Sequence, residues 1–134
     1  MKPTETSYTL AASSKDYAEC HALEFAEQGS ESHSYSFPTV IARRDGEVVG
    51  FLATIPPDKY VIAGPLVIKG GRNPVIAMRL IEAYDSVMKR LGMKLYYFTV
   101  DASRSDALSI KRMEELGMKH WATTDGIAWM KREL

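Results

Sequence analysis

The first part of the chain changes from a strand-like to a helix-like pattern of apolar and polar residues. Residues 7–12 alternate weakly and predict a short strand. Helix-capping side chains at 13–16 predict a helix over 15–28, which is expected to end at Gly29. The serine-rich stretch 30–38 keeps no sustained period and is therefore expected to form a loop or a short second helix.

Two β-rich runs follow at 39–42 and 47–54, and the turn between them ends in Asp45-Gly46. An Asp-Gly pair favours a tight hairpin because both central residues of a type I′ turn need a positive φ. A mostly apolar run at 60–68 predicts a buried strand. Within it, Gly64-Pro65 predicts a bulge or a strand splayed from its neighbour, since proline cannot donate to a β-ladder.

The clearest helix of the sequence is predicted over 74–91. Asn73 is a helix-capping residue, Pro74 is favoured at the first helical position, and apolar residues then recur at helical spacing. Asp85 and Lys89 lie one turn apart, and we expect this pair on the solvent side of the helix.

The remaining pattern predicts a strand, a helix and two further strands. β-branched and aromatic residues at 94–100 predict a buried strand. Capping residues at 103–106 predict a helix that stops at Gly117. The last strands are expected at 120–123 and 127–131, joined by a second Asp-Gly turn.

Composition and charge narrow the class of protein. The 134 residues are 46% hydrophobic, which predicts one core and a single domain over 1–134. Because 17 Lys and Arg balance 17 Asp and Glu, no net charge attracts nucleic acid or a membrane, and neither is expected as a partner. A single cysteine excludes an intramolecular disulfide, no Cys/His spacing fits zinc, and a polar amino terminus favours the cytoplasm.

The segment 106–118 fits the spacing N-x-x-A-x-x-x-Y-x-x-x-G-F, with Asp106, Ser109, Met113, Gly117 and Met118 at the marked positions. Only the glycine is retained in identity. This spacing belongs to the late helix of the GNAT N-acetyltransferase superfamily, and the predicted element order resembles that family over essentially the whole chain. The resemblance implies an α/β (α+β) fold, the acyl-CoA N-acyltransferase fold, with a central mixed β-sheet flanked by helices.

The stretch 69–77 resembles the family's coenzyme A loop, Q/R-x-x-G-x-G/A, whose backbone amides and helix amino terminus bind pyrophosphate. With Arg72 at the first position, Val75 replaces the first glycine, so the loop departs from the pattern there. An ordinary strand-to-helix turn is the alternative. The resemblance also implies that the strand 60–68 runs parallel to 94–100 and splays from it, so that pantetheine bonds to its backbone.

Acetyl-CoA is thus the cofactor that the resemblance implies. The residues it assigns to cofactor binding are Leu66, Val67, Ile68, Gly70, Gly71, Arg72, Asn73, Pro74, Val75, Ile76 and Asp106.

The catalytic residues are left unassigned by the sequence. Acetyl transfer to an amine needs a deprotonated nucleophile, a polarised carbonyl and a proton for the leaving thiolate. Many family members supply that proton from the late-helix tyrosine, but Met113 at this place cannot donate one. Tyr96, Tyr97 and His120 are stand-in candidates, although aromatic residues at strand spacing usually belong to a core.

Two hypotheses follow from these observations. One is an acetyl-CoA-dependent N-acetyltransferase that acts on a primary amine of a small molecule or peptide and relies mainly on proximity and orientation. The other is a GNAT-like binding or structural module without activity, of the kind found among phage and prophage genes. A homodimer is compatible with both.

Overall fold

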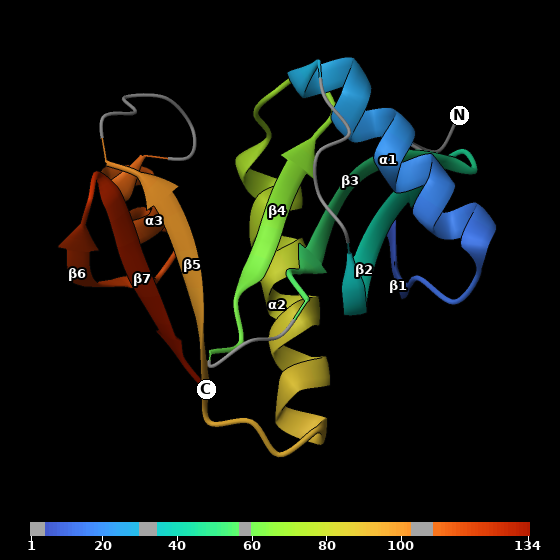
Figure 1. Cartoon of the computed structure of the whole chain (residues 1–134). Coiled ribbons are helices and arrows are strands. Elements are labelled where there is room, and N and C mark those ends of the chain that lie inside the picture. The colour runs from blue at the N-terminus through green and yellow to red at the C-terminus, as the bar shows by residue number, and fades with distance from the viewer. Residues whose placement is uncertain (1–4, 30–34, 57–59, 103–108) are drawn as a thin grey trace.

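The computed structural model describes residues 5–29, 35–56, 60–102 and 109–134 (Figure 1). Its elements occur in the order predicted from the sequence. They are β1 (Ser7–Leu10), α1 (Ser14–Gln28), β2 (Ser36–Arg44), β3 (Glu47–Thr54), β4 (Ala63–Ile68), α2 (Pro74–Arg90), β5 (Leu95–Asp101), α3 (Ile110–Glu115), β6 (Lys119–Thr124) and β7 (Ile127–Glu133).

The start of β2 corrects one sequence prediction. Residues 36–38 were expected to lie in a loop or second helix, but they belong to the strand. Ser36 pairs with Thr54 of β3 across a register shift, and the Thr39 hydroxyl donates to the Ser36 carbonyl. Pairing with β3 holds this irregular strand end in place. The serine-rich sequence therefore does not need a strand period of its own, and the prediction missed it.

Local capping signals are confirmed at both long helices. The Ser13 side chain accepts from the Asp16 amide at the start of α1, which ends at the left-handed Gly29. Asn73 caps α2 by accepting from the Ile76 amide. Both Asp-Gly turns also form, with positive φ at each of their central residues. The late helix is an exception. The predicted capping residues 103–106 lie outside the described residues, but α3 begins at Ile110, where the extended Ser109 is the cap and accepts from the Arg112 amide, so the earlier start predicted for this helix is wrong.

The strands form two antiparallel sheets, β1-β2-β3-β4 and β5-β7-β6. One parallel bridge, between Ile62 and Tyr97, connects them, and the Tyr97 amide donates to the Val61 carbonyl at 2.9 Å. β4 and β5 are therefore parallel neighbours that α2 connects, as predicted, and they diverge beyond the bridge (Figure 1). We call this diverging pair the fork.

The bulge predicted at Gly64-Pro65 is present at the base of the fork. Leu52 pairs with Leu66 and Thr54 pairs with Ala63, so two steps along β3 match three steps along β4. The glycine has a φ of 148°, a value that residues with a side chain rarely adopt. The extra residue interrupts the regular pairing of β4 with β3, which resumes at Leu66, close to the bridge where β4 leaves β5.

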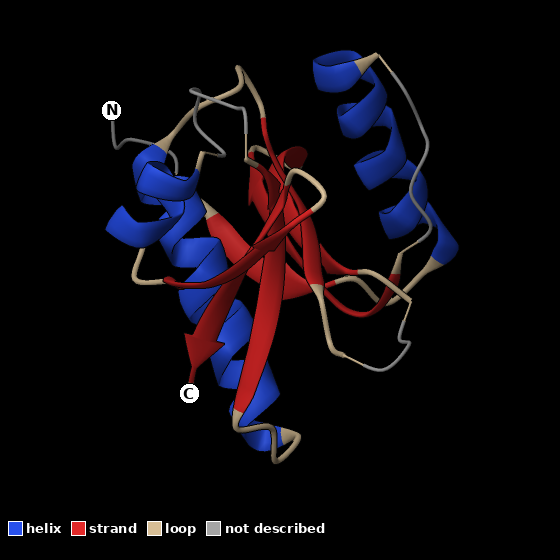
Figure 2. Cartoon of the chain, turned by 60° about the vertical axis from the view of Figure 1, so that its left-hand side comes forward, coloured by secondary structure: helices blue, strands red, loops and turns tan. Residues whose placement is uncertain are grey.

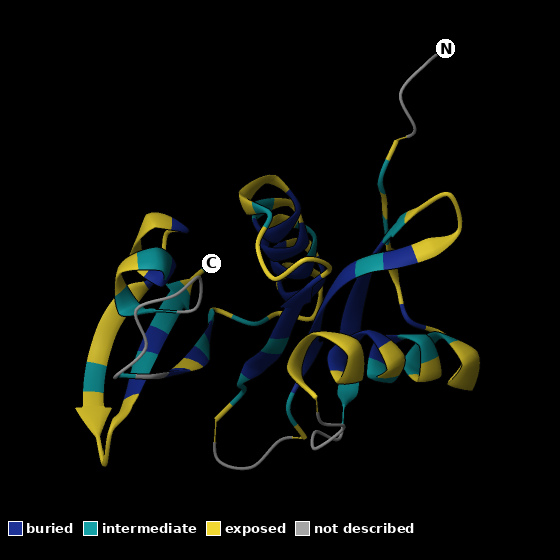
Figure 3. Cartoon of the chain, turned by 90° about the horizontal axis from the view of Figure 1, so that it is seen from above, coloured by how far each residue is buried: buried dark blue, intermediate teal, exposed yellow. Residues whose placement is uncertain are grey.

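Helices cover both faces of the first sheet (Figures 2 and 3). α1 lies on one face over a core cluster that includes Cys20, Ile41 and Phe51. α2 lies on the other face, over a larger cluster to which both sheets contribute, including Leu52 and Tyr96. No helix in the described part of the chain is long and apolar enough to cross a membrane.

Two adjacent polar residues of α2 bind one sheet each. The Tyr84 hydroxyl shares a 2.6 Å hydrogen bond with the Thr54 hydroxyl of β3. Asp85 accepts from the Tyr96 hydroxyl of β5 at 2.7 Å and from Arg132 of β7 at 2.7 and 3.1 Å. α2 is thus the common support of both sheets.

Asp85 corrects a second expectation, because it does not pair with Lys89 at the surface. Its exposed fraction is only 7%. Asp85 follows buried Tyr84 and lies one turn after Ile81, so it belongs to the buried face by position. The charge of its side chain misled the prediction, and its charged partner, Arg132, is remote in sequence.

The buried tyrosines predict a loss of stability at high pH. Burial raises the pKa of Tyr84 to about 12, whereas the ordinary value is about 10. Since the folded protein holds this proton more tightly, the stabilisation is present below pH ~10 and is lost as the pH rises. Tyr84→Phe should cost about 1 kcal/mol at neutral pH and reduce the alkaline decline in the free energy of unfolding.

Urea unfolding at neutral pH and at about pH 11 measures both effects. An unchanged alkaline decline in Tyr84→Phe would contradict the assignment.

Candidate functional site

The free edge of β4 presents backbone groups to the fork. The Lys69 amide donates to the Val49 carbonyl of β3, which makes this a hydrogen-bonded pair of the antiparallel ladder. Alternation along the strand directs the Val67 backbone toward β3 as well. The amides of Leu66 and Ile68 therefore point away from β3, toward the side of β5.

This alternation refines the sequence-based assignment for β4. Leu66, Val67 and Ile68 were all expected to offer backbone to a ligand, but only Leu66 and Ile68 have their amides on the fork side. The Val67 side chain packs instead in the core cluster under α1. A chain-like ligand in the fork thus meets two amides, two residues apart.

The loop that follows β4 leads directly into the amino terminus of α2, and its backbone amides are divided between two roles. The Gly71 amide donates to the Ile68 carbonyl at 2.9 Å, and the Ile76 amide donates to the Asn73 side chain at 3.2 Å. Pro74 has no amide hydrogen. In the described part of the chain, amides without a hydrogen-bond acceptor remain at Gly70, Arg72, Asn73 and Val75.

These four amides lie beside the positive end of the α2 dipole, an arrangement that attracts an anion. The side chains of Arg72 and Val75 are exposed, and Ile76 is buried under them. Gly50 of β3 allows this close approach, because a Cβ there would lie 3.2 Å from the Ile76 side chain. The geometry suits a phosphate group.

The first turn of α2 also borders a surface hollow of about 440 Å³, whose lining carries two arginines and one carboxylate, Glu5. Arg44, at the end of β2, and Arg79 of α2 both line it. Burial raises the pKa of Tyr8 in this hollow, although both arginines oppose that shift. An anion at the α2 amino terminus therefore has Arg44 close by in addition to Arg72, while Arg79 pairs with Glu82 at 3.2 Å.

Of the three sequence-based catalytic candidates, the structure brings only Tyr97 to the fork. Tyr97 forms the bridge with Ile62 at the vertex. Tyr96 is fully buried and donates to Asp85 on the opposite side of β5; burial and the Asp85 carboxylate raise its pKa. His120 is on the outer strand β6, where its ring nitrogen lies 2.7 Å from the Thr123 hydroxyl.

Met113 occupies the interior of the molecule. Its exposed fraction is 2%, and it belongs to the core cluster between α2 and the sheets. The apolar stripe of its helix therefore accounts for this residue without a chemical role. Asp106, the remaining cofactor candidate, lies outside the described residues.

Sequence reasoning missed a buried carboxylate on α1. Glu24 is fully buried and accepts a 2.5 Å hydrogen bond from the Tyr35 hydroxyl. The Tyr35 ring stacks on His21 at 4.2 Å and contacts Phe51 of β3. The sequence did not indicate the partner of Glu24, because Tyr35 lies just before β2 in the stretch that has no sequence period. A helical position one turn after buried Cys20 was the available signal for Glu24.

Solved N-acetyltransferases resemble this structure over almost its whole length. A GNAT family N-acetyltransferase from Escherichia coli, in complex with coenzyme A, has a TM-score of 0.77 and 15% identity, covering 99% of this chain and 83% of that chain. Aminoglycoside 6′-acetyltransferase type Ii has a TM-score of 0.73 and 18% identity, with coverage of 95% and 96%.

An acyl-CoA N-acyltransferase from Pseudomonas aeruginosa gives the same TM-score of 0.73 at 18% identity, with coverage of 96% and 99%. No protein-family model and no curated protein sequence matches the chain. The likenesses establish the fold, and they confirm the fold class expected from the sequence.

The packing role of Met113 predicts a stability effect. Met113→Ala removes buried side-chain atoms from the core and should lower the free energy of unfolding by about 2–5 kcal/mol. Met78→Ala, at a half-buried methionine of α2, is the matched control and should cost clearly less. Urea unfolding measures both, and equal losses in the two variants would contradict the packing role.

Proposed function

We propose that this chain, whose fold is that of the GNAT N-acetyltransferases, is an acetyl-CoA-dependent N-acetyltransferase that acetylates a primary amine of a small molecule or peptide. The observation that carries the proposal is the shared position of two sets of backbone amides. The fork-side amides of Leu66 and Ile68 lead along β4 to the loop at the α2 amino terminus. Acetyl-CoA, which joins a pyrophosphate to a long arm that carries amide groups, would bind to both sets of amides.

The residues present fit acetyl-CoA at this place. The free amides of Gly70, Arg72, Asn73 and Val75, together with the Arg72 side chain, would hold the pyrophosphate, since anions bind at helix amino termini. Leu66 and Ile68 would bond to the pantetheine arm. The glycine missing at position 75 does not block the loop, because the exposed Val75 side chain points away from the core.

When bound, acetyl-CoA supplies an activated thioester. In the transfer the amine nitrogen would form a bond to the acetyl carbon and lose one proton, while the carbon–sulfur bond would break and the leaving sulfur would take up one proton. The Ile68 or Leu66 amide would polarise the acetyl carbonyl. Orientation of the amine against the thioester supplies a large part of the rate enhancement.

Tyr97 is the proposed proton donor to the thiolate. It is the one candidate at the fork, and its ring lies on the side of β5 opposite to the buried Tyr96. The late-helix position at which many family members carry a proton-donating tyrosine is Met113 in this chain, and methionine cannot donate a proton.

A non-catalytic binding module is the second candidate, and the buried Met113 and Tyr96 favour it. The two functions separate in one pair of measurements. Thermal shift with acetyl-CoA reports binding, and thiol release across a panel of amines reports transfer. Binding without transfer would support the module.

The setting of the protein is part of the proposal. A single domain over 1–134 fits the core cluster that α2 shares with both sheets. A reducing cytoplasm fits the lone Cys20, whose thiol is buried and has its pKa raised to about 12 by that burial. A homodimer stays compatible with the function.

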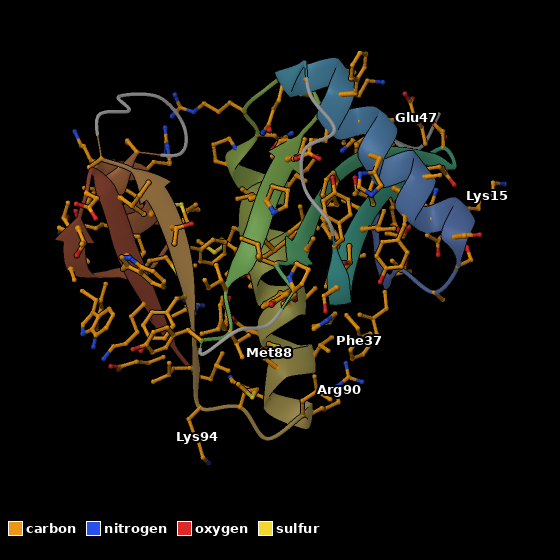
Figure 4. All side chains as sticks on the ribbon, viewed as in Figure 1. Lys15, Phe37, Glu47, Met88, Arg90 and Lys94 are labelled. Carbon is orange, nitrogen blue, oxygen red and sulfur yellow. The ribbon has the colours of Figure 1, made fainter. Side chains whose placement is uncertain are left out.

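Arg72→Ala should weaken coenzyme A binding about ten-fold or more, because it removes a charge-assisted bond to phosphate. Arg90→Ala is the matched control. This arginine is at the opposite end of the same helix, as Figure 4 shows, and should leave affinity unchanged. Calorimetric titration measures both variants, and failure of the unmodified protein to bind at millimolar coenzyme A would refute the proposal.

Tyr97→Phe should lower turnover by at least about ten-fold while leaving coenzyme A affinity intact, because it removes only the hydroxyl proton. The kcat from thiol release and the calorimetric Kd test this together. Full turnover in Tyr97→Phe would remove the tyrosine from the mechanism.

A further inference from the structure

Four aromatic side chains from four segments meet on one face of the β5-β7-β6 sheet. We call Tyr60, Tyr97, Trp121 and Trp129 the aromatic patch. Tyr97 lies 5.3 Å from Trp121 and 5.9 Å from Trp129, measured between ring centroids. Tyr60 lies 5.4 to 6.4 Å from the other three rings. Most of these pairs have edge-to-face geometry, which aromatic groups prefer.

The aromatic patch is not part of the core. On β5, Tyr97 lies between the buried Tyr96 and Phe98, so its ring is on the face turned away from α2. Trp121 is 51% exposed and Tyr60 is 37% exposed. The core cluster under α1 includes no residue of this sheet, so in the described part of the chain no helix covers this face. Exposed aromatic groups at this density mark a binding surface.

The aromatic patch is continuous with the vertex of the fork. Its Tyr97 forms the bridge to Ile62 and donates its amide to Val61. Tyr60 directly precedes that pair of residues in the chain. A molecule on the aromatic patch therefore has one end at the point where β4 and β5 separate.

The charges on the same face disfavour a polycation. Lys119 and Lys131 face each other across β6 and β7, and Glu133 follows Lys131 on the same side. Glu133 lies 3.2 Å from each lysine nitrogen, and these contacts lower its pKa. Both positive charges meet this one carboxylate, so this part of the face offers no spare negative charge to a second ammonium group.

We propose that the aromatic patch binds the acceptor, and that the acceptor is an arylalkylamine: a single primary amine on a short alkyl chain that ends in an aromatic ring. The ring stacks among the four side chains, and the amine extends to the fork. The face of a ring also attracts the ammonium form before it loses its proton. This inference names the substrate class of the proposed function and rests on it.

Intrinsic fluorescence gives a test that needs no turnover. The chain contains 2 tryptophans, Trp121 and Trp129, and both belong to the aromatic patch. Titration with phenethylamine should change their emission with saturation at millimolar concentration. Spermidine and n-butylamine, which lack a ring, should not do so. An absent response to phenethylamine, or an equal response to spermidine, would overturn the proposal.

Kinetics with Trp121→Ala provide the second test. This exposed substitution should raise KM for phenethylamine at least about five-fold, through loss of one aromatic contact, and leave KM for acetyl-CoA unchanged. Trp121→Phe should restore most of the difference. Leu91→Ala, at an apolar residue that is 53% exposed at the end of α2, is the control and should alter neither constant.

The outcomes separate this proposal from the proposed function. Saturable fluorescence with no thiol release supports an aryl-amine site and counts against the transferase. Transfer that prefers spermidine or butylamine over phenethylamine supports the transferase and overturns the acceptor class. A dimer on size exclusion that Trp121→Ala dissociates would also overturn it, because a second copy would then cover the aromatic patch.

Discussion

The carboxylate of Asp85 holds the two halves of the molecule at a fixed angle. The sheets share only the bridge between Ile62 and Tyr97 in the described structure, so the backbone alone leaves their relative orientation weakly determined. Asp85 of α2 binds β5 through Tyr96 and β7 through Arg132, while Tyr84 beside it binds β3. Asp85 is buried and the Arg132 side chain is 22% exposed, so removing the Asp85 carboxylate would leave the Tyr96 hydroxyl without its acceptor and the partly buried Arg132 without its charged partner.

The fork follows from that support and from one irregularity in β4. α2 lies under both sheets, and Gly64-Pro65 adds the residue that interrupts regular pairing of β4 with β3 near the vertex. Beyond it, β4 keeps β3 on one side and presents alternate amides on the other. The loop to α2 then continues from the same strand end. One helix and one bulge thus bring the two sets of amides to one side of the molecule.

Local signals made most of the fold predictable. The caps of α1 and α2, both Asp-Gly turns and the Gly64-Pro65 bulge act within a few residues, and each formed where the sequence placed it. The cap of α3 did not, because Ser109 takes that position and not residues 103–106. Contacts between distant segments were not predictable in the same way. The charge of Asp85 predicted a surface position, because its partner Arg132 is remote in sequence. The sequence of residues 36–38 has no strand period, so the extension of β2 was not predicted.

The same division applies to the candidate site. The glycine-rich loop and the splayed strand could be predicted from the sequence, because a site made of backbone groups depends on a local motif. A site made of side chains depends on neighbours that only the tertiary structure brings together. Tyr96 and Tyr97 are adjacent and chemically identical, yet strand alternation buries one against Asp85 and leaves the other among exposed rings at the vertex. Sequence reasoning weighed them equally because only the position of α2 distinguishes the two faces of β5.

A weak acid–base apparatus increases the importance of how the acceptor is held. General acid–base assistance typically contributes about 10²–10⁴-fold, and the buried Met113 excludes its usual source on the late helix. Positioning two reactants can supply about 7–11 kcal/mol of the barrier, but only when both are oriented. In the proposed function the amides of β4 would orient the thioester side alone. The four rings beside the vertex would provide the corresponding constraint on the amine, so under this proposal the aromatic patch and the fork depend on each other.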